Sequence, residues 1–167
     1  MKQYEGENIT MATSQFPNGF IWSASTSSWQ FEGRMENDLK GLSIQDIKEN
    51  RIADEVCSDH VHHLKEDIEL LKELGLNAYR FSISWSRIFP TGRGNLNEVG
   101  LNFYRDLIKQ LNLAGIKPIV TMYHDDLPAD LWKKGGWLNR ETIDAFVEYA
   151  ELLLKENGEV QLIRRAE

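Results

Sequence analysis

The feature that most constrains the fold is a repeated order, in which a strand-like run is followed by an amphipathic helix. Strand-like runs occur at residues 19–24, 78–84, 117–123 and, more weakly, 160–163. From the second run onward the strands recur at a spacing of roughly forty residues with a helix between them, which indicates β/α units and a parallel sheet. The sequence therefore predicts an α/β fold.

Three segments between these runs have helical periodicity, at residues 59–75, 97–115 and 139–157. Each begins with Asp or Asn, which cap helix N-termini, and ends at or just before Gly, which favours helix C-termini. The first carries one apolar stripe at helical spacing, formed by Val61, Leu64, Ile68, Leu71 and Leu74. These stripes predict helices that pack on the sheet.

The run at 78–84 predicts a strand with two different faces. Its apolar side chains Tyr79, Phe81 and Ile83 alternate with Arg80, Ser82 and Ser84. In a closed barrel the polar face points inward, where an unpaired guanidinium would cost several kcal/mol. Arg80 therefore needs an anionic partner, and no residue in this segment supplies one.

Composition narrows the classes of function. The chain has 167 residues, a net charge of −7 and a pI near 5.2, which disfavour partnership with nucleic acid or an anionic membrane. The single cysteine, Cys57, forms no internal disulfide and suits a reducing compartment. No stretch has the apolar length of a signal peptide or membrane span, so we expect a cytoplasmic protein.

Several long motifs, in a common order, resemble family 1 glycoside hydrolases. They are FPNGFIWSASTSSWQFEG, NAYRFSISWSRIFPTG, NEVGLNFYRDLI, GIKPIVTMYHDDLP and GGWLNRETIDAFVEYA. The resemblance covers residues 16–158 and implies the N-terminal part of a TIM (β/α)8 barrel, with three to four β/α units and an incomplete barrel. We expect residues 1–15 to be a flexible extension, 16–158 the partial glycosidase domain and 159–167 a divergent tail.

The activity that the resemblance implies is hydrolysis of O-glycosidic bonds in β-glucosides or 6-phospho-β-glucosides. This retaining chemistry uses two glutamates about 5 Å apart. The family places them in an Asn-Glu-Pro motif after the fourth strand and a Glu-Asn-Gly motif after the seventh. The one Glu-Asn-Gly of this chain, at 156–158, follows a helical pattern rather than a strand, so we interpret it as a coincidence. No catalytic residue, cofactor or metal is therefore expected within the chain.

Three residues match site positions of the family. Gln30 and His124 match the residues that contact the sugar, and Arg80 matches the arginine that holds the nucleophile. An amide both donates and accepts hydrogen bonds, which suits neighbouring sugar hydroxyls. Two positions depart from the pattern: Asp125 replaces an aromatic residue, and Ser23 replaces a glycine.

Other residue groups favour ordinary structural roles. His60, His62 and His63 lack an H-E-x-x-H pattern and a third ligand, which disfavours a metal site. Glu32 and Glu36 resemble a carboxylate pair, but their irregular segment has no burial signal, so we expect both to be solvated. The adjacent aspartates 125–126 are weak evidence for a metal.

The tryptophans are expected to serve mainly in packing. This applies to Trp22, Trp85, Trp132 and Trp137. Trp29 is the exception, since it follows the first strand-like run and can lie near a barrel mouth.

Two alternatives to catalysis remain open. The chain alone can be a truncated, non-catalytic remnant that lacks both glutamates, which we favour for the isolated polypeptide. It can also be a sugar-binding or assembly half-barrel, whose open sheet edges invite self-association. The segment GLSIQD, at residues 41–46, is closer to the 6-phospho branch of the family.

Overall fold

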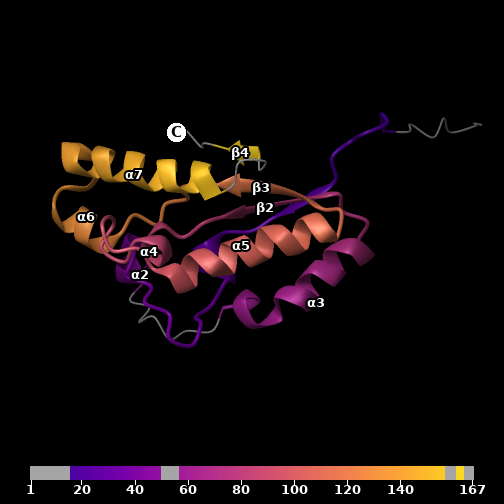
Figure 1. Ribbon diagram of the computed structural model, residues 1–167, viewed down its shortest axis with the longest axis horizontal. Coiled ribbons are helices and arrows are strands. Elements are labelled where there is room, and N and C mark those ends of the chain that lie inside the picture. The colour runs from indigo at the N-terminus through magenta and orange to yellow at the C-terminus, as the bar shows by residue number, and fades with distance from the viewer. Residues whose placement is uncertain (1–15, 50–56, 157–160, 164–167) are drawn as a thin grey trace, which may run out of the picture.

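The computed structural model describes residues 16–49, 57–156 and 161–163. Four strands form one parallel sheet in the order β1-β2-β3-β4 (Figure 1). Their bounds are β1 Ser23–Ser25, β2 Ala78–Ser82, β3 Lys117–Thr121 and β4 Gln161–Ile163. Within the described residues β1 pairs only with β2, and β4 only with β3, so the sheet is open at both edges. The predicted α/β class is confirmed.

The long helices lie in chain order along the sheet, as Figure 1 shows. They are α3 His60–Glu73, α5 Glu98–Leu113 and α7 Arg140–Glu156, and all three were predicted. Asn97 caps α5 by accepting a hydrogen bond from the Gly100 amide. Asp59 occupies the N-cap position of α3 as expected, but its backbone is left-handed and its side chain makes no cap hydrogen bond. None of the described helices has the length and apolarity needed to cross a membrane.

Short helices that the sequence pattern did not predict lie between each of the first three strands and the next long helix. They are α1 Ser28–Phe31, α2 Ile44–Lys48, α4 Trp85–Ile88, α6 Ala129–Lys133 and the 3-10 helix η1 Gly136–Leu138. Because α1, α4 and α6 each follow one strand of a parallel sheet, they lie at its carboxyl-terminal end. Figure 1 shows α2, α4 and α6 gathered at that end.

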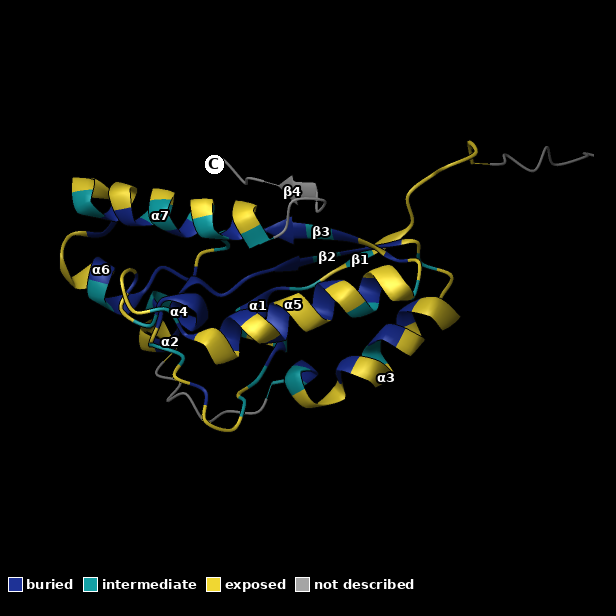
Figure 2. Ribbon diagram, viewed as in Figure 1, coloured by how far each residue is buried: buried dark blue, intermediate teal, exposed yellow. Residues whose placement is uncertain are grey.

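The core lies between the sheet and the inward stripes of the long helices. Tyr79, Phe81 and Ile83 are buried, which confirms the predicted apolar face of β2. Trp85 is fully buried, and its ring stacks on Tyr149 with centroids 5.3 Å apart. Figure 2 shows the helices buried along one side and exposed along the other. This pattern places the opposite, polar face of the sheet outside the helix-packed core.

The first strand begins later than predicted. Residues 17–20 form a turn closed by the Phe20 amide and the Pro17 carbonyl, and the Trp22 amide donates to the Asn77 side chain. Phe16, Phe20 and Trp22 instead contact one another, with ring centroids 4.6–4.8 Å apart. The packing prediction for tryptophan holds for Trp85, which is fully buried. Trp22 and Trp137 are partly exposed but also pack against other aromatic rings, whereas Trp132 is about half exposed.

Gly41 is a close-contact point between the loop before α2 and the segment after α4. A Cβ atom there would lie 1.9 Å from the Pro90 carbonyl oxygen, while the Gly41 amide donates to Ser86. Gly41→Ala is therefore expected to lower the free energy of unfolding by about 1–3 kcal/mol, measured by urea denaturation. Leu39→Ala, at an exposed position of the same loop, is the control and should change it by less than about 0.5 kcal/mol. Equal effects would show that the contact is unimportant.

Candidate functional site

The three residues that the motifs single out lie on the polar face or carboxyl end of the sheet. Gln30 belongs to α1, which follows β1, and His124 follows β3. Arg80 lies within β2, the strand between these two. Since all strands are parallel, Gln30 and His124 lie at the same carboxyl-terminal end of the sheet. TIM barrels place their active sites at this end.

Arg80 bridges neighbouring strands through hydroxyl groups. Its Nε donates to Thr121 Oγ1 at 2.9 Å and its Nη1 donates to Ser25 Oγ at 3.2 Å. The pairing register places Ser25, Arg80 and Ile119 side by side. The sequence led us to expect an anionic partner, but within the described residues the side chain of Arg80 donates its hydrogen bonds to hydroxyl groups. The open sheet leaves this side chain half-exposed to solvent, which removes the penalty on which that expectation depended.

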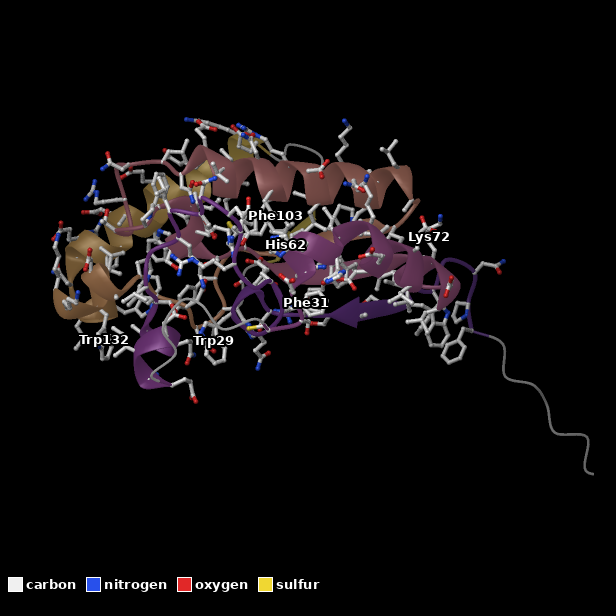
Figure 3. The ribbon with its side chains drawn as sticks, turned by 90° about the horizontal axis from the view of Figure 1, so that it is seen from below. Trp29, Phe31, His62, Lys72, Phe103 and Trp132 are labelled. Atoms are coloured by element: carbon white, nitrogen blue, oxygen red, sulfur yellow. The ribbon has the colours of Figure 1, made fainter. Side chains whose placement is uncertain are left out.

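Gln30 is held by its own helix but presents its side chain to solvent. The Ser27 hydroxyl donates to Gln30 Oε1 at 2.8 Å. The Ser28 amide donates to Ser82 Oγ at 2.8 Å, which fixes α1 to β2. Figure 3 labels Trp29 and Phe31, the two neighbours of Gln30 in α1. Trp29 is half-buried and donates from Nε1 to Asp46 at 3.0 Å, so it joins α1 to α2.

His124 is half-buried, and its amide lies beside a buried carboxylate. Asp126 is 1% exposed and accepts hydrogen bonds from the His124 amide at 3.4 Å and the Trp85 amide at 3.2 Å. Burial raises the pKa of Asp126 to about 7. Asp125, by contrast, is exposed and has a positive φ of 60°. The two adjacent aspartates therefore have different roles, and the buried one orders the segment that carries His124.

Glu32 corrects the sequence analysis, because it is buried rather than solvated. It is 4% exposed, and it accepts hydrogen bonds from Arg87 Nε at 3.1 Å and from the Tyr104 hydroxyl at 2.8 Å. The prediction was wrong because the partner of Glu32 lies 55 residues away in sequence. Arg87, within the apolar stretch WSRIF, was the available signal of a buried partner. Glu36 is exposed, as predicted.

Arg87 is the centre of this buried network. It is fully buried, pairs with Glu32 and Asp38, and donates from Nη2 to the Gly33 carbonyl at 2.7 Å. Burial disfavours its charge, but the surrounding acidic groups, Glu32 first, raise the pKa of Arg87 on balance. Burial and the Glu32 charge also raise the pKa of Tyr104 well above its usual range. The network is charged, hydrogen-bonded and closed to water.

The three neighbouring histidines each contact a different carboxylate. His60 pairs with Asp67 at 2.6 Å, His62 with Asp59 at 2.7 Å and His63 with Glu66 at 2.7 Å. In the part of the chain that the structure describes, no three His, Cys, Asp or Glu side chains are placed to hold a metal ion. Each of these histidines therefore has a carboxylate contact within α3 or with its N-cap residue.

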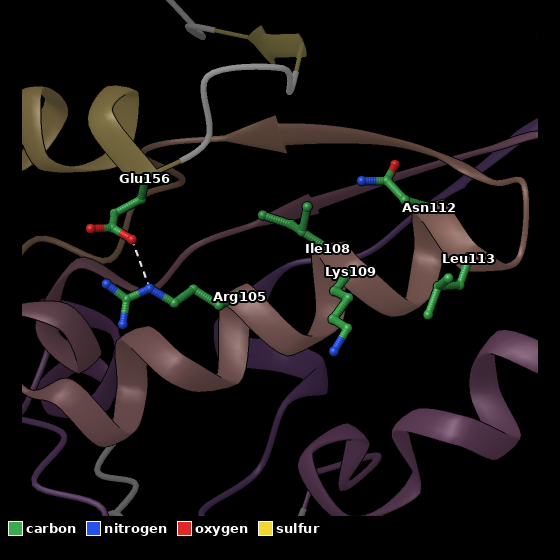
Figure 4. A pocket seen from close by; sticks show the side chains of 6 residues that line it. All are labelled: Arg105, Ile108, Lys109, Asn112, Leu113 and Glu156. Atoms are coloured by element: carbon green, nitrogen blue, oxygen red, sulfur yellow. Dashed lines mark hydrogen bonds and ion pairs between the residues drawn. The ribbon is translucent and has the colours of Figure 1, made fainter.

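A crevice of about 480 Å³ lies on the helix side of the sheet. Its lining residues, drawn in Figure 4, are Arg105, Ile108, Lys109, Asn112, Leu113 and Glu156. Arg105 Nε donates to Glu156 at 2.7 Å, and this hydrogen bond lowers the pKa of Glu156. Glu156 is the last residue of α7, so it does not stand at the end of a strand, in agreement with our interpretation of this tripeptide.

Glu156→Gln is therefore expected to have little effect. The ion pair with Arg105 is partly exposed at the surface, so its loss should change the free energy of unfolding by less than about 1 kcal/mol. Urea denaturation measures this difference. A loss above about 2 kcal/mol would show that Glu156 has a larger role than a surface ion pair.

Residues 12–164 match the sequence profile of Glycosyl hydrolase family 1. The chain belongs to this family. It is 46% identical over 158 residues to β-glucosidase A of Acetivibrio thermocellus, covering 90% of this chain and 35% of that protein. It is 45% identical over 157 residues to β-glucosidase A of Thermotoga maritima, with 89% and 35% covered.

Solved structures of family 1 proteins agree with this assignment. The β-glucosidase of Thermotoga maritima superposes with a TM-score of 0.82 at 43% identity, covering 91% of this chain and 36% of that one. The same enzyme in complex with deoxynojirimycin gives a TM-score of 0.80, with 89% and 36% covered. The chain thus spans about 35% of the length of the curated relatives named here. The predicted fold is confirmed: the open parallel sheet is part of a family 1 TIM barrel.

The predicted division into domains stays a prediction. Residues 1–15 and most of 159–167 lie outside the described residues. The roles of Gln30, His124 and Arg80 also stay predictions.

Proposed function

We propose that this chain forms one side of the sugar pocket of a retaining β-glycosidase, which hydrolyses O-glycosidic bonds of β-glucosides. The observation that carries the proposal is the placement of Gln30, His124 and Arg80 on the polar face and carboxyl end of a family 1 sheet. This end of a TIM barrel holds the active site in characterised enzymes of the fold.

Each of the three residues suits a distinct task. Gln30 can donate to one sugar hydroxyl and accept from the next, and its exposed side chain is open to a ligand. His124 contributes an imidazole from the segment after β3, whereas Gln30 comes from the segment after β1, so the two flank β2. Arg80, held by two hydroxyls, keeps a half-exposed guanidinium that can meet a carboxylate across the barrel. The two glutamates of the retaining mechanism would come from other parts of the barrel.

The unphosphorylated β-glucoside is the substrate that we propose. The relatives named above are β-glucosidases, and GLSIQD, the segment that suggested a 6-phospho-β-glucoside, has structural tasks. Its Ser43 and Asp46 form the capping box of α2, and Asp46 also accepts the Trp29 indole hydrogen bond. Gly41 packs against Pro90. These contacts explain the segment without a phosphate.

The first experiment assays the purified chain with nitrophenyl β-glucoside and with its 6-phosphate. We expect no turnover by the chain alone, because hydrolysis needs two opposed carboxylates and the buried Glu32 is committed to Arg87. Turnover by the chain would contradict this expectation if replacing one of its own Asp or Glu residues abolished that turnover. The same assay with a full-length barrel that contains this chain should give a higher rate with nitrophenyl β-glucoside than with its 6-phosphate. A higher rate with the 6-phosphate would reverse our choice of substrate.

A sugar-binding or assembly role is the second candidate, favoured by the two open sheet edges. Open edges offer unpaired backbone groups to a further strand, whether from another part of the barrel or a second copy. Calorimetric titration of the chain with cellobiose tests the binding role. We expect affinity weaker than millimolar, since one side of a pocket buries little of the sugar. We place the protein in cytoplasmic carbohydrate metabolism as part of this proposal.

A further inference from the structure

The short helix α4 lies between the two segments that carry Gln30 and His124. It follows β2, while those segments follow β1 and β3 on either side. In each of the two segments, the residue that contacts α4 lies two positions after Gln30 or His124. Glu32 follows Gln30 and contacts Arg87 of α4, whereas Asp126 follows His124 and contacts Trp85 of α4.

The contact on the β1 side is a buried guanidinium with all three of its nitrogen atoms engaged. Arg87 donates to Glu32, Asp38 and the Gly33 carbonyl. Tyr104 donates its hydroxyl to the same carboxylate of Glu32, at 2.8 and 3.0 Å to its two oxygens. Because α1 has only four residues, its own hydrogen bonds cannot keep it folded, and these tertiary contacts must do so.

The contact on the β3 side uses a buried carboxylate and two backbone amides. Asp126 accepts from the Trp85 amide, one of the amides that the first turn of a helix leaves without an intrahelical partner. Its other oxygen accepts from the His124 amide. Trp85 itself is fully buried and stacked on Tyr149, so this end of α4 is fixed in the core.

We propose that α4 is a positioning element that sets where Gln30 and His124 stand relative to one another. Arg87 acts on Gln30 through Glu32, and the Trp85 amide acts on His124 through Asp126. Neither Arg87 nor Asp126 is a catalytic residue in this proposal. The identity of the sugar site rests on the proposed function, but the positioning is a property of the chain without sugar.

Amide hydrogen exchange of the 167-residue chain tests the first contact. Arg87→Lys keeps the charge but replaces the planar fork by a single ammonium. We expect the amides of Gln30, Phe31 and Glu32 to exchange at least about tenfold faster, while the Ile83 amide, bonded to Thr121 in the sheet, changes less than about twofold. Tyr104→Phe, a milder change, should act on the same three amides if Arg87→Lys does not fold.

Two matched variants test whether the effect of Arg87→Lys is specific to the α1 amides. Asp126→Asn should accelerate exchange at His124 and leave the α1 amides unchanged. Arg105→Lys, which alters an exposed arginine–carboxylate pair, should affect neither segment. Uniform acceleration of all amides in Arg87→Lys and Tyr104→Phe, or unchanged α1 amides, would overturn the proposal.

An activity readout separates positioning from loss of stability. It uses a chimera in which residues 16–163 replace the matching part of the Thermotoga maritima β-glucosidase. Arg87→Lys should lower kcat/KM for nitrophenyl β-glucoside about tenfold. It should lower kcat/KM little further in a Gln30→Ala background, because both changes remove the proposed contact of Gln30 with the sugar. Additive effects would overturn the proposal. If the chimera is folded but inactive, the proposed function fails, and hydrogen exchange still decides the positioning role.

Discussion

Arg87→Met is expected to lower the free energy of unfolding by about 3–5 kcal/mol, a large part of the stability of a domain of this size. The substitution keeps an unbranched side chain of similar length but removes the guanidinium that pairs with Glu32 and Asp38. Both carboxylates are buried, so each would remain without its charged partner in a water-excluded site. Urea denaturation followed by circular dichroism measures the loss.

Two comparisons establish that burial is the cause. Arg105→Met removes an arginine whose carboxylate partners lie at the surface, and should cost less than about 1 kcal/mol. Adding Glu32→Gln and Asp38→Asn to Arg87→Met should recover part of the loss, because the penalty comes from the unpaired buried charges. A similar cost for the Arg87 and Arg105 variants would contradict the account of the network.

The second large effect is a loss of stability as the pH rises, caused by Asp126. Its pKa is about 7 in the folded chain and 3.8 as its ordinary value. Between these values the folded state binds more protons than the unfolded state, so the free energy of unfolding falls with increasing pH. A difference of about three units corresponds to about 4 kcal/mol, lost progressively from about pH 4 to about pH 8.

Asp126→Asn is the control for the pH effect. Asparagine has nearly the same shape but does not ionise, so the variant should lack this part of the slope. Urea denaturation of both proteins at pH 5, 6, 7 and 8 gives the comparison. Parallel pH profiles for the two proteins would show that the pKa of Asp126 is not raised in the folded state.

The long elements were predictable because their signals are local and repeated. Residues 59–75, 97–115 and 139–157 each hold several turns of one apolar stripe, and the run at 78–84 alternates apolar and polar side chains. The one-turn helices α1, α4 and α6 carry too few residues for any periodicity. Tertiary contacts such as those of Arg87 fix them, and a single sequence does not reveal such contacts.

The site was predictable from motifs rather than from the chemistry of single residues. Gln30 and His124 were singled out because of the sequences that surround them, and the structure places both at the carboxyl-terminal end of the sheet. Glu32 was missed because its partner is distant along the chain. Asp126 was seen only as half of an acidic pair, since burial separates it from Asp125 and no local pattern records that burial.

The most direct test of the central claim is the hydrolysis of nitrophenyl β-glucoside by the chimera with the Thermotoga maritima enzyme. We expect the chimera to be active, and Gln30→Ala and His124→Ala each to lower its kcat/KM by about 10- to 100-fold, since each removes a side chain that we propose to hydrogen-bond the sugar. A folded chimera that is inactive, or whose rate is unchanged by both substitutions, would contradict the claim that this chain supplies one side of a β-glucoside pocket.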